Sequence, residues 1–196
     1  MVTVRRAAAS DMPVLARTYA RAFVDDPVIR WLIPDDAEYA LIGERFFAAF
    51  AARFLAQECL WCTDDGVAVA GWNLPGRPAV EVDDPDPIDH PDWRVERFVA
   101  IGELLGANTP PEPHWHLNLL GTHPDWQRRG LGGTLMAEVF VVADETGLPC
   151  YLETETPENV AYYRRHGFVV RTEWELAVPG SDGPHMWGMV RPPRGS

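Results

Sequence analysis

The chain has 196 residues, 46% of them hydrophobic, with 29 acidic and 17 basic side chains and a formal net charge of −12. This apolar content excludes a wholly disordered chain, and the length fits one domain, because domains usually have roughly 100–200 residues. The acidic balance argues against general nucleic-acid binding and favours a cationic partner, and the lack of lysine excludes Schiff-base chemistry and a Walker-type phosphate loop.

The first half of the chain predicts helices and strands from the period of its apolar residues. Leu15, Tyr19 and Phe23 recur four apart, which is typical of one helix face. Ser10–Asp11 can cap that helix, and Asp26–Pro27 should end it. The predicted elements are a strand at 2–4, a helix from residue 10 to about 26, a helix over about 37–57, and strands over about 58–63 and 67–73.

Cys59 and Cys62 have the spacing of a metal or redox pair, and Cys150 is the third cysteine of the chain. The segment around the first two has the pattern of a strand, in which residues three apart point to opposite faces. We therefore expect buried small side chains, in a reducing compartment. The N-terminus lacks the apolar core of a signal peptide, and no apolar run approaches the ~20 residues of a membrane span, so we expect a cytoplasmic protein without membrane contact.

Residues 74–91 predict an irregular segment, because prolines interrupt any regular pattern. Its acidic side chains favour either a solvated surface loop or a mobile rim that attracts a cationic substrate. The prolines and acids concerned are Pro75, Pro78, Pro85, Pro87 and Pro91, and Glu81, Asp83, Asp84, Asp86 and Asp89.

The second half predicts a more regular alternation of strands and helices, and so an α/β or α+β architecture. Gly147 and Pro149 should end its long helix, and Gly167 its short one. The predicted elements are a helix over about 92–106, a strand at 115–121, a helix from about 131 to 146, a strand at 150–153, a helix at 158–165, and strands over about 168–176 and 185–191.

A glycine-rich turn precedes the long helix and predicts an anion site. The first turn of a helix has free backbone N–H groups and partial positive charge, which suit a phosphate. Arg128 and Arg129 add positive charge there, and Gly130, Gly132 and Gly133 let an anion approach the backbone. A turn that only permits close packing is the alternative, and a dinucleotide fold fits less well because the motif follows four earlier strands.

The stretch from Gln127 to Gly132, Gln-Arg-Arg-Gly-Leu-Gly, resembles the Gln/Arg-x-x-Gly-x-Gly/Ala signature of the GNAT superfamily of N-acetyltransferases. Two flanking stretches agree with that family in order and spacing, namely 119–124 before the turn and the Tyr-x-x-x-Gly-Phe motif at 163–168. The resemblance covers 112–192 closely and the first half loosely. The end of the chain and residues 22–27 resemble the small-molecule branch that includes puromycin N-acetyltransferase.

The resemblance implies a mixed, mostly antiparallel twisted sheet of about seven strands flanked by helices, with a splay between strands 4 and 5. It implies one domain over 1–196, with an acceptor-side half at 1–111 and an acetyl-CoA-binding half at 112–192. Acetyl-CoA would be the co-substrate, and no metal would be needed. The residues that would contact acetyl-CoA are Leu120, Gly121, Thr122, Gln127, Arg128, Arg129, Gly130, Leu131, Gly132, Gly133, Asn159 and Tyr163.

Tyr163 matches the family's tyrosine that protonates the departing thiolate, and packing of its ring on the core is the alternative. A phenol with a reference pKa near 10 holds its proton at neutral pH and can act as a general acid. Asn159 lies one helical turn before it, either as a cofactor contact or as a polar residue of the helix N-terminus. Glu153 ends its strand near the expected thioester and is the candidate base, with a structural role as the alternative, and Glu155 is a poorer candidate. His114 and His116 share a strand face, but no carboxylate is spaced to complete a metal site.

The acceptor pocket should come from the variable first half. An aromatic and acidic pocket suits a cationic amine. The candidate side chains are Tyr19, Phe23, Asp26, Trp31 and Trp72, although aromatic residues of this kind also build cores.

These features predict acetyl-CoA-dependent N-acetylation of a small cationic amine, with an aminonucleoside-like antibiotic and hence antibiotic resistance as one candidate. The alternatives are a non-catalytic acyl-CoA-binding regulatory module and an acetyltransferase for protein N-termini or lysine side chains. The expected partner is the small-molecule substrate, without nucleic acid or membrane, and relatives suggest a monomer or homodimer.

Overall fold

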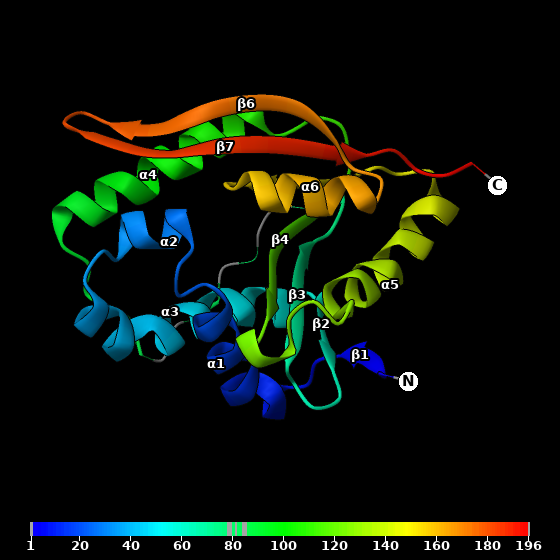
Figure 1. Ribbon diagram of the computed structural model, residues 1–196, viewed down its shortest axis with the longest axis horizontal. Coiled ribbons are helices and arrows are strands. Elements are labelled where there is room, and N and C mark those ends of the chain that lie inside the picture. Colours follow the sequence, from blue (N-terminus) through cyan, green and yellow to red (C-terminus); the bar gives the residue numbers. More distant parts are fainter. Residues whose placement is uncertain (1, 78–79, 81, 84–85, 196) are drawn as a thin grey trace.

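A seven-stranded mixed sheet with the order β1-β2-β3-β4-β5-β7-β6 forms the centre of the computed structural model, which describes residues 2–77, 80, 82–83 and 86–195 (Figure 1). β4 and β5 run parallel, and every other neighbouring pair runs antiparallel. The strands are β1 (Val4–Arg6), β2 (Leu60–Thr63), β3 (Ala68–Asn73), β4 (Trp115–Thr122), β5 (Cys150–Thr154), β6 (Val169–Val178) and β7 (Ser181–Arg191). The expected α/β fold with a mostly antiparallel sheet is confirmed.

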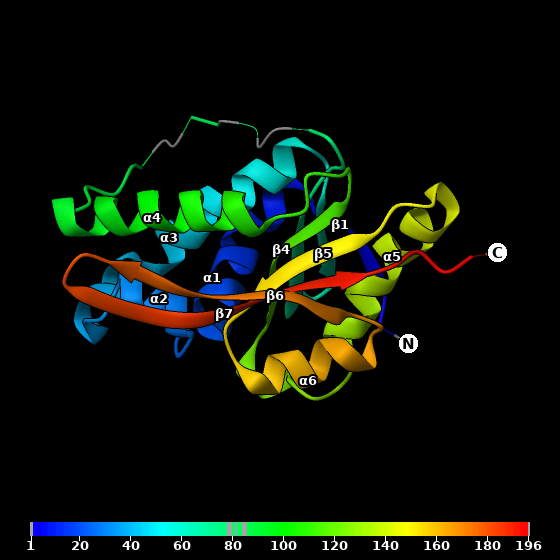
Figure 2. The same cartoon turned by 90° about the horizontal axis from the view of Figure 1, so that it is seen from above.

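Helices cover both faces of the sheet (Figures 1 and 2). One core cluster joins α1 and α3 to β2 and β3, and a second joins α5 and α6 to the opposite face. The helices are α1 (Met12–Ala22), α2 (Pro27–Leu32), α3 (Asp36–Ala56), α4 (Asp92–Asn108), α5 (Leu131–Thr146) and α6 (Pro157–Arg165), with short 3-10 turns η1 (Ala9–Asp11) and η2 (Pro124–Trp126).

The long β6–β7 hairpin extends past the end of β5 and runs alongside α4 (Figure 2). A third apolar cluster of Trp31, Leu176 and Met186 joins α2 to this hairpin. The hairpin and the N-terminal helices therefore enclose space beside the end of β5.

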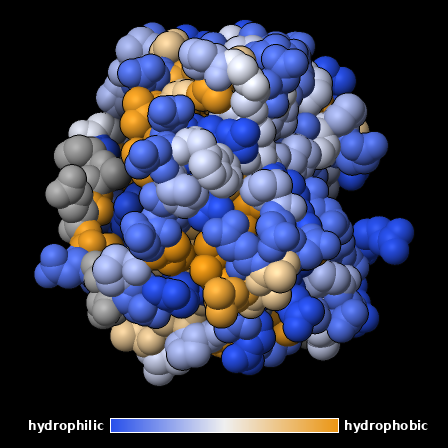
Figure 3. Space-filling model, turned by 90° about the vertical axis from the view of Figure 1, so that its left-hand side faces the viewer, coloured by the Kyte–Doolittle hydropathy of each residue, from blue (hydrophilic) through white to orange (hydrophobic). Residues whose placement is uncertain are grey.

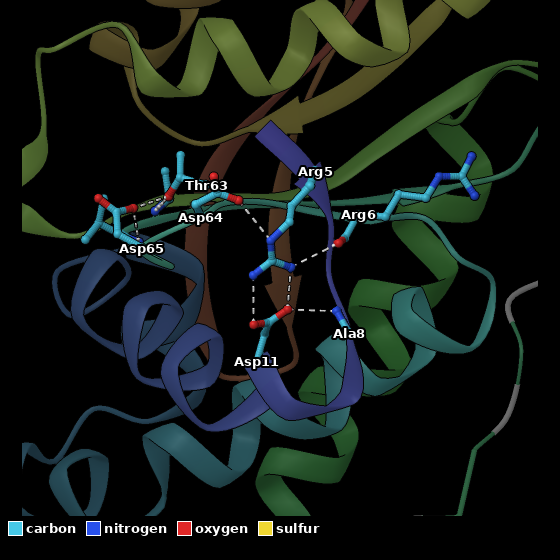
Figure 4. A network of polar contacts seen from close by, with 9 residues as sticks. Arg5, Arg6, Ala8, Asp11, Thr63, Asp64 and Asp65 are labelled. Carbon is cyan, nitrogen blue, oxygen red and sulfur yellow. Dashed lines mark hydrogen bonds and ion pairs between the residues drawn. The ribbon is translucent and has the colours of Figure 1, made fainter. Parts of the chain in front are cut away.

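Arg5 ties the first strand to two other elements (Figure 4). Its guanidinium donates to both carboxylate oxygens of Asp11 at 2.7 and 3.0 Å, and to Asp64 in the β2–β3 turn at 3.0 Å. The hydrogen bonds from Arg5 and from the N–H of Ala8 lower the pKa of Asp11 to about 2. These bonds fix the start of α1 against the sheet edge.

Two local expectations need correction. α1 ends at Ala22, and Asp26 does not close it but begins α2, since its carboxylate accepts the N–H of Ile29 at 2.9 Å. Asp-Pro is an N-terminal helix signal as well as a stop signal, because proline suits the first helical position. The first strand begins at Val4, two residues later than predicted.

Three further expectations concern cysteines, membrane spans and the proline-rich segment. The cysteines are free and buried, and Cys59 and Cys62 lie in the core clusters on opposite faces, as strand alternation predicts. Among the described helices, none is long and apolar enough to cross a membrane. Within the irregular segment, the positions of Pro78, Glu81, Asp84 and Pro85 lie outside the described residues.

Candidate functional site

The turn before α5 presents free backbone donors. Gly130 takes a left-handed conformation with φ 81°, and the first helical hydrogen bond runs from the N–H of Thr134 to the Gly130 carbonyl at 3.1 Å. The N–H groups of residues 131–133 therefore have no acceptor within the helix, and the helix dipole adds partial positive charge. This geometry fits the diphosphate of a CoA thioester.

Gly132 and Gly133 lie against α6, as the close-packing alternative for this turn requires. A Cβ atom on Gly132 would lie 2.6 Å from the Tyr162 hydroxyl, and one on Gly133 would lie 2.6 Å from Cε1 of His166. Both missing side chains thus point at α6, so these glycines allow α5 and α6 to pack closely. At Gly130 nothing lies within 4 Å of the Cβ position, so packing does not require a glycine there. Its left-handed backbone conformation is what favours glycine.

The polar residues of the turn connect it to β4. The side-chain amide of Gln127 donates to the Thr122 carbonyl at 3.2 Å. Arg129 lies over the Trp126 ring, 4.6 Å from its centre, and Arg128 has a left-handed φ of 61° and is exposed. Both guanidinium groups therefore stay at the surface near the free N–H groups.

β4 and β5 separate at the site. They pair only over 115–117 and 150–152, and β4 has a register shift against β3 around residue 118. From α1, the Tyr19 hydroxyl donates to the Leu119 carbonyl at 3.4 Å. This bond fixes the β4 backbone just beyond the last residue that pairs with β5. The unpaired edge of β4 faces a gap, as the predicted splay requires.

A cavity of about 530 Å³ opens where the two strands separate. Figure 3 views the side where α2, α3, α4 and the hairpin meet, and shows apolar patches among hydrophilic residues there. Among the described residues that line the cavity there are four carboxyl groups and no arginine or histidine. The acids are Asp25, Asp26, Glu153 and Glu155, and the aromatic side chains are Phe23, Phe46, Phe47, Phe50, Phe98 and Tyr163.

Asp26 and Glu155 form a carboxyl pair in this cavity. Both side chains line the cavity and interact with each other, and Glu155 also accepts from the Asn159 amide at 3.3 Å. Burial, reinforced by the charge of Asp26, raises the pKa of Glu155 to about 9, and burial also raises the pKa of Asp26. The pair is therefore unlike an ordinary surface carboxylate at neutral pH.

Glu153 has a separate set of partners. One of its oxygens lies 2.6 Å from Nε2 of His116, and the other accepts from the Thr109 hydroxyl at 3.4 Å. In the described part of the chain, no group of three or more histidine, cysteine or acidic side chains is arranged to hold a metal. His116 is thus a carboxylate partner, a role that its position on a strand face beside His114 did not reveal.

Tyr163 lines the cavity from α6, one helical turn after Asn159. Burial, followed by the nearby charge of Glu155, raises the pKa of its phenol. Asn159 lies at the helix N-terminus, where its N–H is capped by Thr156 and its side-chain amide donates to Glu155, and its contact with the cofactor stays a prediction. Leu120, Thr122 and Gln127 also line the cavity, whereas Gly121 does not.

The five candidate acceptor residues divide into two groups. Phe23 and Asp26 line the cavity. Tyr19 and Trp72 are fully buried in the two main core clusters, and Trp31 packs on the hairpin, where its indole N–H donates to Ser181 at 3.1 Å. These three are corrected to core positions, because helix and sheet packing encloses their rings away from the cavity.

The model of the acetyltransferase (GNAT) family matches residues 29–168 of the chain. The chain belongs to this family. It is accordingly an acetyl-CoA-dependent N-acetyltransferase, and the resemblance is confirmed at the level of the superfamily. An uncharacterised N-acetyltransferase of Schizosaccharomyces pombe is 24% identical over 187 residues, which cover 86% of this chain and 74% of that protein.

Solved structures share the fold. A Corynebacterium glutamicum protein described as histone acetyltransferase HPA2 and related acetyltransferase has a TM-score of 0.67 at 22% identity, covering 100% of this chain and 98% of that one. Arylalkylamine N-acetyltransferase 2 of Aedes aegypti has a TM-score of 0.69 at 10% identity, covering 98% and 99%. Polyamine N-acetyltransferase of Drosophila melanogaster has a TM-score of 0.67 at 12% identity, covering 98% and 100%.

Proposed function

We propose that the chain transfers the acetyl group of acetyl-CoA to the primary amine of a small cationic molecule with an apolar body. The main support is the composition of the cavity, which has four carboxyl groups, five phenylalanines and no basic side chain among its described lining residues. Such surroundings attract an ammonium group and bury an apolar body. Arylalkylamine and polyamine N-acetyltransferases among the structural neighbours support this class, and an aminonucleoside-like antibiotic is one candidate member.

The turn before α5 would hold the diphosphate with the N–H groups of residues 131–133, and the unpaired edge of β4 would hold the pantetheine arm. When bound, acetyl-CoA supplies the acetyl group as a thioester. The diphosphate contact rests on the free donors and positive φ described above. The arm would lie in the gap between β4 and β5, beside Leu120 and Thr122.

In the proposed reaction, Glu153 accepts a proton from the amine, and Tyr163 donates a proton to the departing sulfur. His116 is a positioning residue, because its 2.6 Å contact fixes one oxygen of Glu153. The raised pKa of Tyr163 keeps its phenol protonated at neutral pH, as a general acid requires. Attack by the amine is direct, and the chain forms no covalent bond to the acetyl group.

The test is amine-dependent release of free CoA thiol over a panel of amines, with Tyr163→Phe as the variant. Loss of a general acid should lower kcat by about 100- to 10,000-fold while CoA affinity stays within about twofold. Tyr162→Phe is the matched control, because its hydroxyl points at Gly132 rather than into the cavity, and it should keep kcat within about threefold.

Three results would contradict the proposal. Unchanged turnover in Tyr163→Phe would remove the acid role. Tight CoA binding without turnover on any amine would indicate a binding module. Turnover on peptides alone would indicate a protein acetyltransferase.

A further inference from the structure

The Asp26–Glu155 pair is the most unusual electrostatic feature of the cavity. Asp26 comes from the start of α2 and Glu155 from the segment between β5 and α6, and both carboxyl groups line the cavity and interact with each other. Two ionised carboxylates that face each other in one cavity repel, and neither can donate a hydrogen bond, so a proton on one of them stabilises the pair. Each also accepts from a fixed donor, Ile29 N–H for Asp26 and the Asn159 amide for Glu155, so the pair is held in place from both sides.

The described residues that line the cavity around the pair carry no positive charge. Arg30 on α2 lies over the Tyr39 ring, 5.3 Å from its centre, and is ion-paired with Asp36. Asp25 lies on the same loop, Glu153 on β5, and the phenols of Tyr163 and Tyr39 approach from α6 and α3. No arginine or histidine is among the described lining residues of the cavity. Two neighbouring carboxylates cannot both ionise cheaply in such surroundings, as other paired carboxyl sites show. Because no described lining residue is basic, a proton or a cationic ligand is the compensation that the cavity leaves open to them.

We infer that Asp26 and Glu155 hold one proton between them before the acceptor binds, and that a cationic amine displaces this proton into solvent as it enters the cavity. The inference rests on the proposed function, and it identifies the carboxyl pair as the group that recognises the charge of the acceptor amine. The ammonium group then takes the place of the proton beside two ionised carboxylates. A neutral analogue of the same shape cannot do so, and the pair therefore discriminates by charge.

The proton count closes over the whole reaction. An ammonium ion and an acetyl thioester yield an amide, a thiol and one proton. In the inferred sequence that proton leaves when the amine binds. The nitrogen itself then loses two protons during the reaction. Glu153 receives one of them, and the other replaces the proton that Tyr163 gives to sulfur. After reaction the neutral amide no longer compensates the carboxylates, so the pair takes up the proton held by Glu153, and the affinity for the product falls.

The experiment uses a permanently charged probe, because an ordinary amine could itself lose a proton on binding. Phenylethylguanidinium has a cationic head and an aromatic body, and its guanidinium group stays protonated at every accessible pH. Its Kd is measured by calorimetry on the full chain with saturating CoA. Displacement of one proton predicts a Kd that falls about 100-fold from pH 6 to pH 8, ten-fold for each pH unit. The range from pH 6 to pH 8 lies below the raised pKa of Glu155, about 9, so the ligand-free pair keeps its shared proton over the whole range.

The variants assign the effect to the pair. Glu155→Gln removes the second carboxyl group and with it the shared proton, so the Kd of the probe should depend on pH much less steeply than in the wild type over the same range. Asp25→Asn is the matched control, because it removes one carboxyl group from the cavity lining without touching the pair, and it should keep the 100-fold change. A flat profile in the wild type, a retained slope in Glu155→Gln, or failure of the wild type to bind the probe would each overturn the inference.

A second measurement separates this inference from the proposed function. The side-chain carboxyl carbon of Glu155 is followed by NMR in ligand-free protein labelled with ¹³C-glutamate, and Glu155→Gln assigns the signal. We expect its titration above pH 7 in the wild type and at a lower pH in Asp26→Asn, where burial still acts on Glu155 but the charge of Asp26 does not. Titration below pH 6 in the wild type overturns the inference even if the chain acetylates amines. Absence of acetyl transfer with the titration intact overturns the proposed function instead.

Discussion

Gly132 offers the sharpest test of what the glycine-rich turn does. In Gly132→Ala the new Cβ would lie 2.6 Å from the Tyr162 hydroxyl oxygen and 3.4 Å from a Leu120 methyl group. The first distance is far inside van der Waals contact, so α5, α6 or the tyrosine ring must move. Tyr162→Phe removes the clashing oxygen and leaves the next ring atom at 3.6 Å, which is an ordinary contact.

The size of the effect follows from two opposing terms. Overpacking costs about 1–3 kcal/mol, and the low end applies because the oxygen is at the tip of its side chain. Replacing glycine by alanine in a helix gains up to about 1 kcal/mol. We expect Gly132→Ala to lower the free energy of unfolding by at most about 1 kcal/mol, and the double variant to recover the overpacking cost, with a coupling of about 1 kcal/mol.

The assay is a double-mutant cycle with two readouts on the same four proteins. Denaturant unfolding gives stability, where 1 kcal/mol corresponds to about 2–4 °C in Tm for a chain of this size, and calorimetry gives CoA affinity. If the glycine serves helix packing, Tyr162→Phe restores both stability and CoA affinity. If stability returns but CoA affinity does not, the phosphate itself needs the glycine. A coupling near zero would refute the contact between α5 and α6.

Two further predictions concern single residues. Asp144 accepts two 2.8 Å hydrogen bonds from Arg191, and these hold the pKa of Asp144 at about 2, below its ordinary value of 3.8. The stabilising effect of this ion pair is therefore complete above about pH 4 and is lost as the pH falls toward 2. Asp144→Asn should cost about 1–3 kcal/mol at pH 7 and clearly less at pH 3 by denaturant unfolding, and an equal loss at both pH values would contradict this assignment. Arg128 holds a left-handed φ of 61°, so Arg128→Gly should raise Tm by about 2–4 °C, and an unchanged or lower Tm would argue against strain there.

Much of the fold could be predicted from the sequence because local periodicity determines it. Strand alternation placed Cys59 and Cys62 on opposite faces, and the structure confirms this. The six-residue helix α2 escaped prediction, because it is too short for an apolar period and begins at Asp26–Pro27, which also marks helix ends. Long helices and strands can thus be predicted from local periodicity, whereas a short connecting helix such as α2 depends on tertiary packing.

The acceptor side of the site could be predicted only in part. Phe23 and Trp72 are both aromatic residues in patterned segments, yet one lines the cavity and the other is fully buried. The difference arises from which helix covers which part of the sheet, which a single sequence does not reveal. The contacts of Glu155 with Asp26 and of Glu153 with His116 likewise join residues far apart in the chain, and their only sequence signal is an acid near a strand end.

The charge-recognition pair and the acid belong to one electrostatic arrangement. Burial is the main cause of the raised pKa of Tyr163, and the charges of Glu155 and Asp26 add to it, so any change in their net charge alters the readiness of the phenol to give up its proton. Exchange of one proton for one ammonium ion leaves the net charge of the cavity unchanged. Tyr163 then experiences nearly the same field before and after the amine binds, and it stays protonated throughout. A pair fully ionised in advance would instead place an uncompensated second negative charge beside the phenol whenever the acceptor is absent, at a cost that the described lining residues, none of them basic, cannot offset.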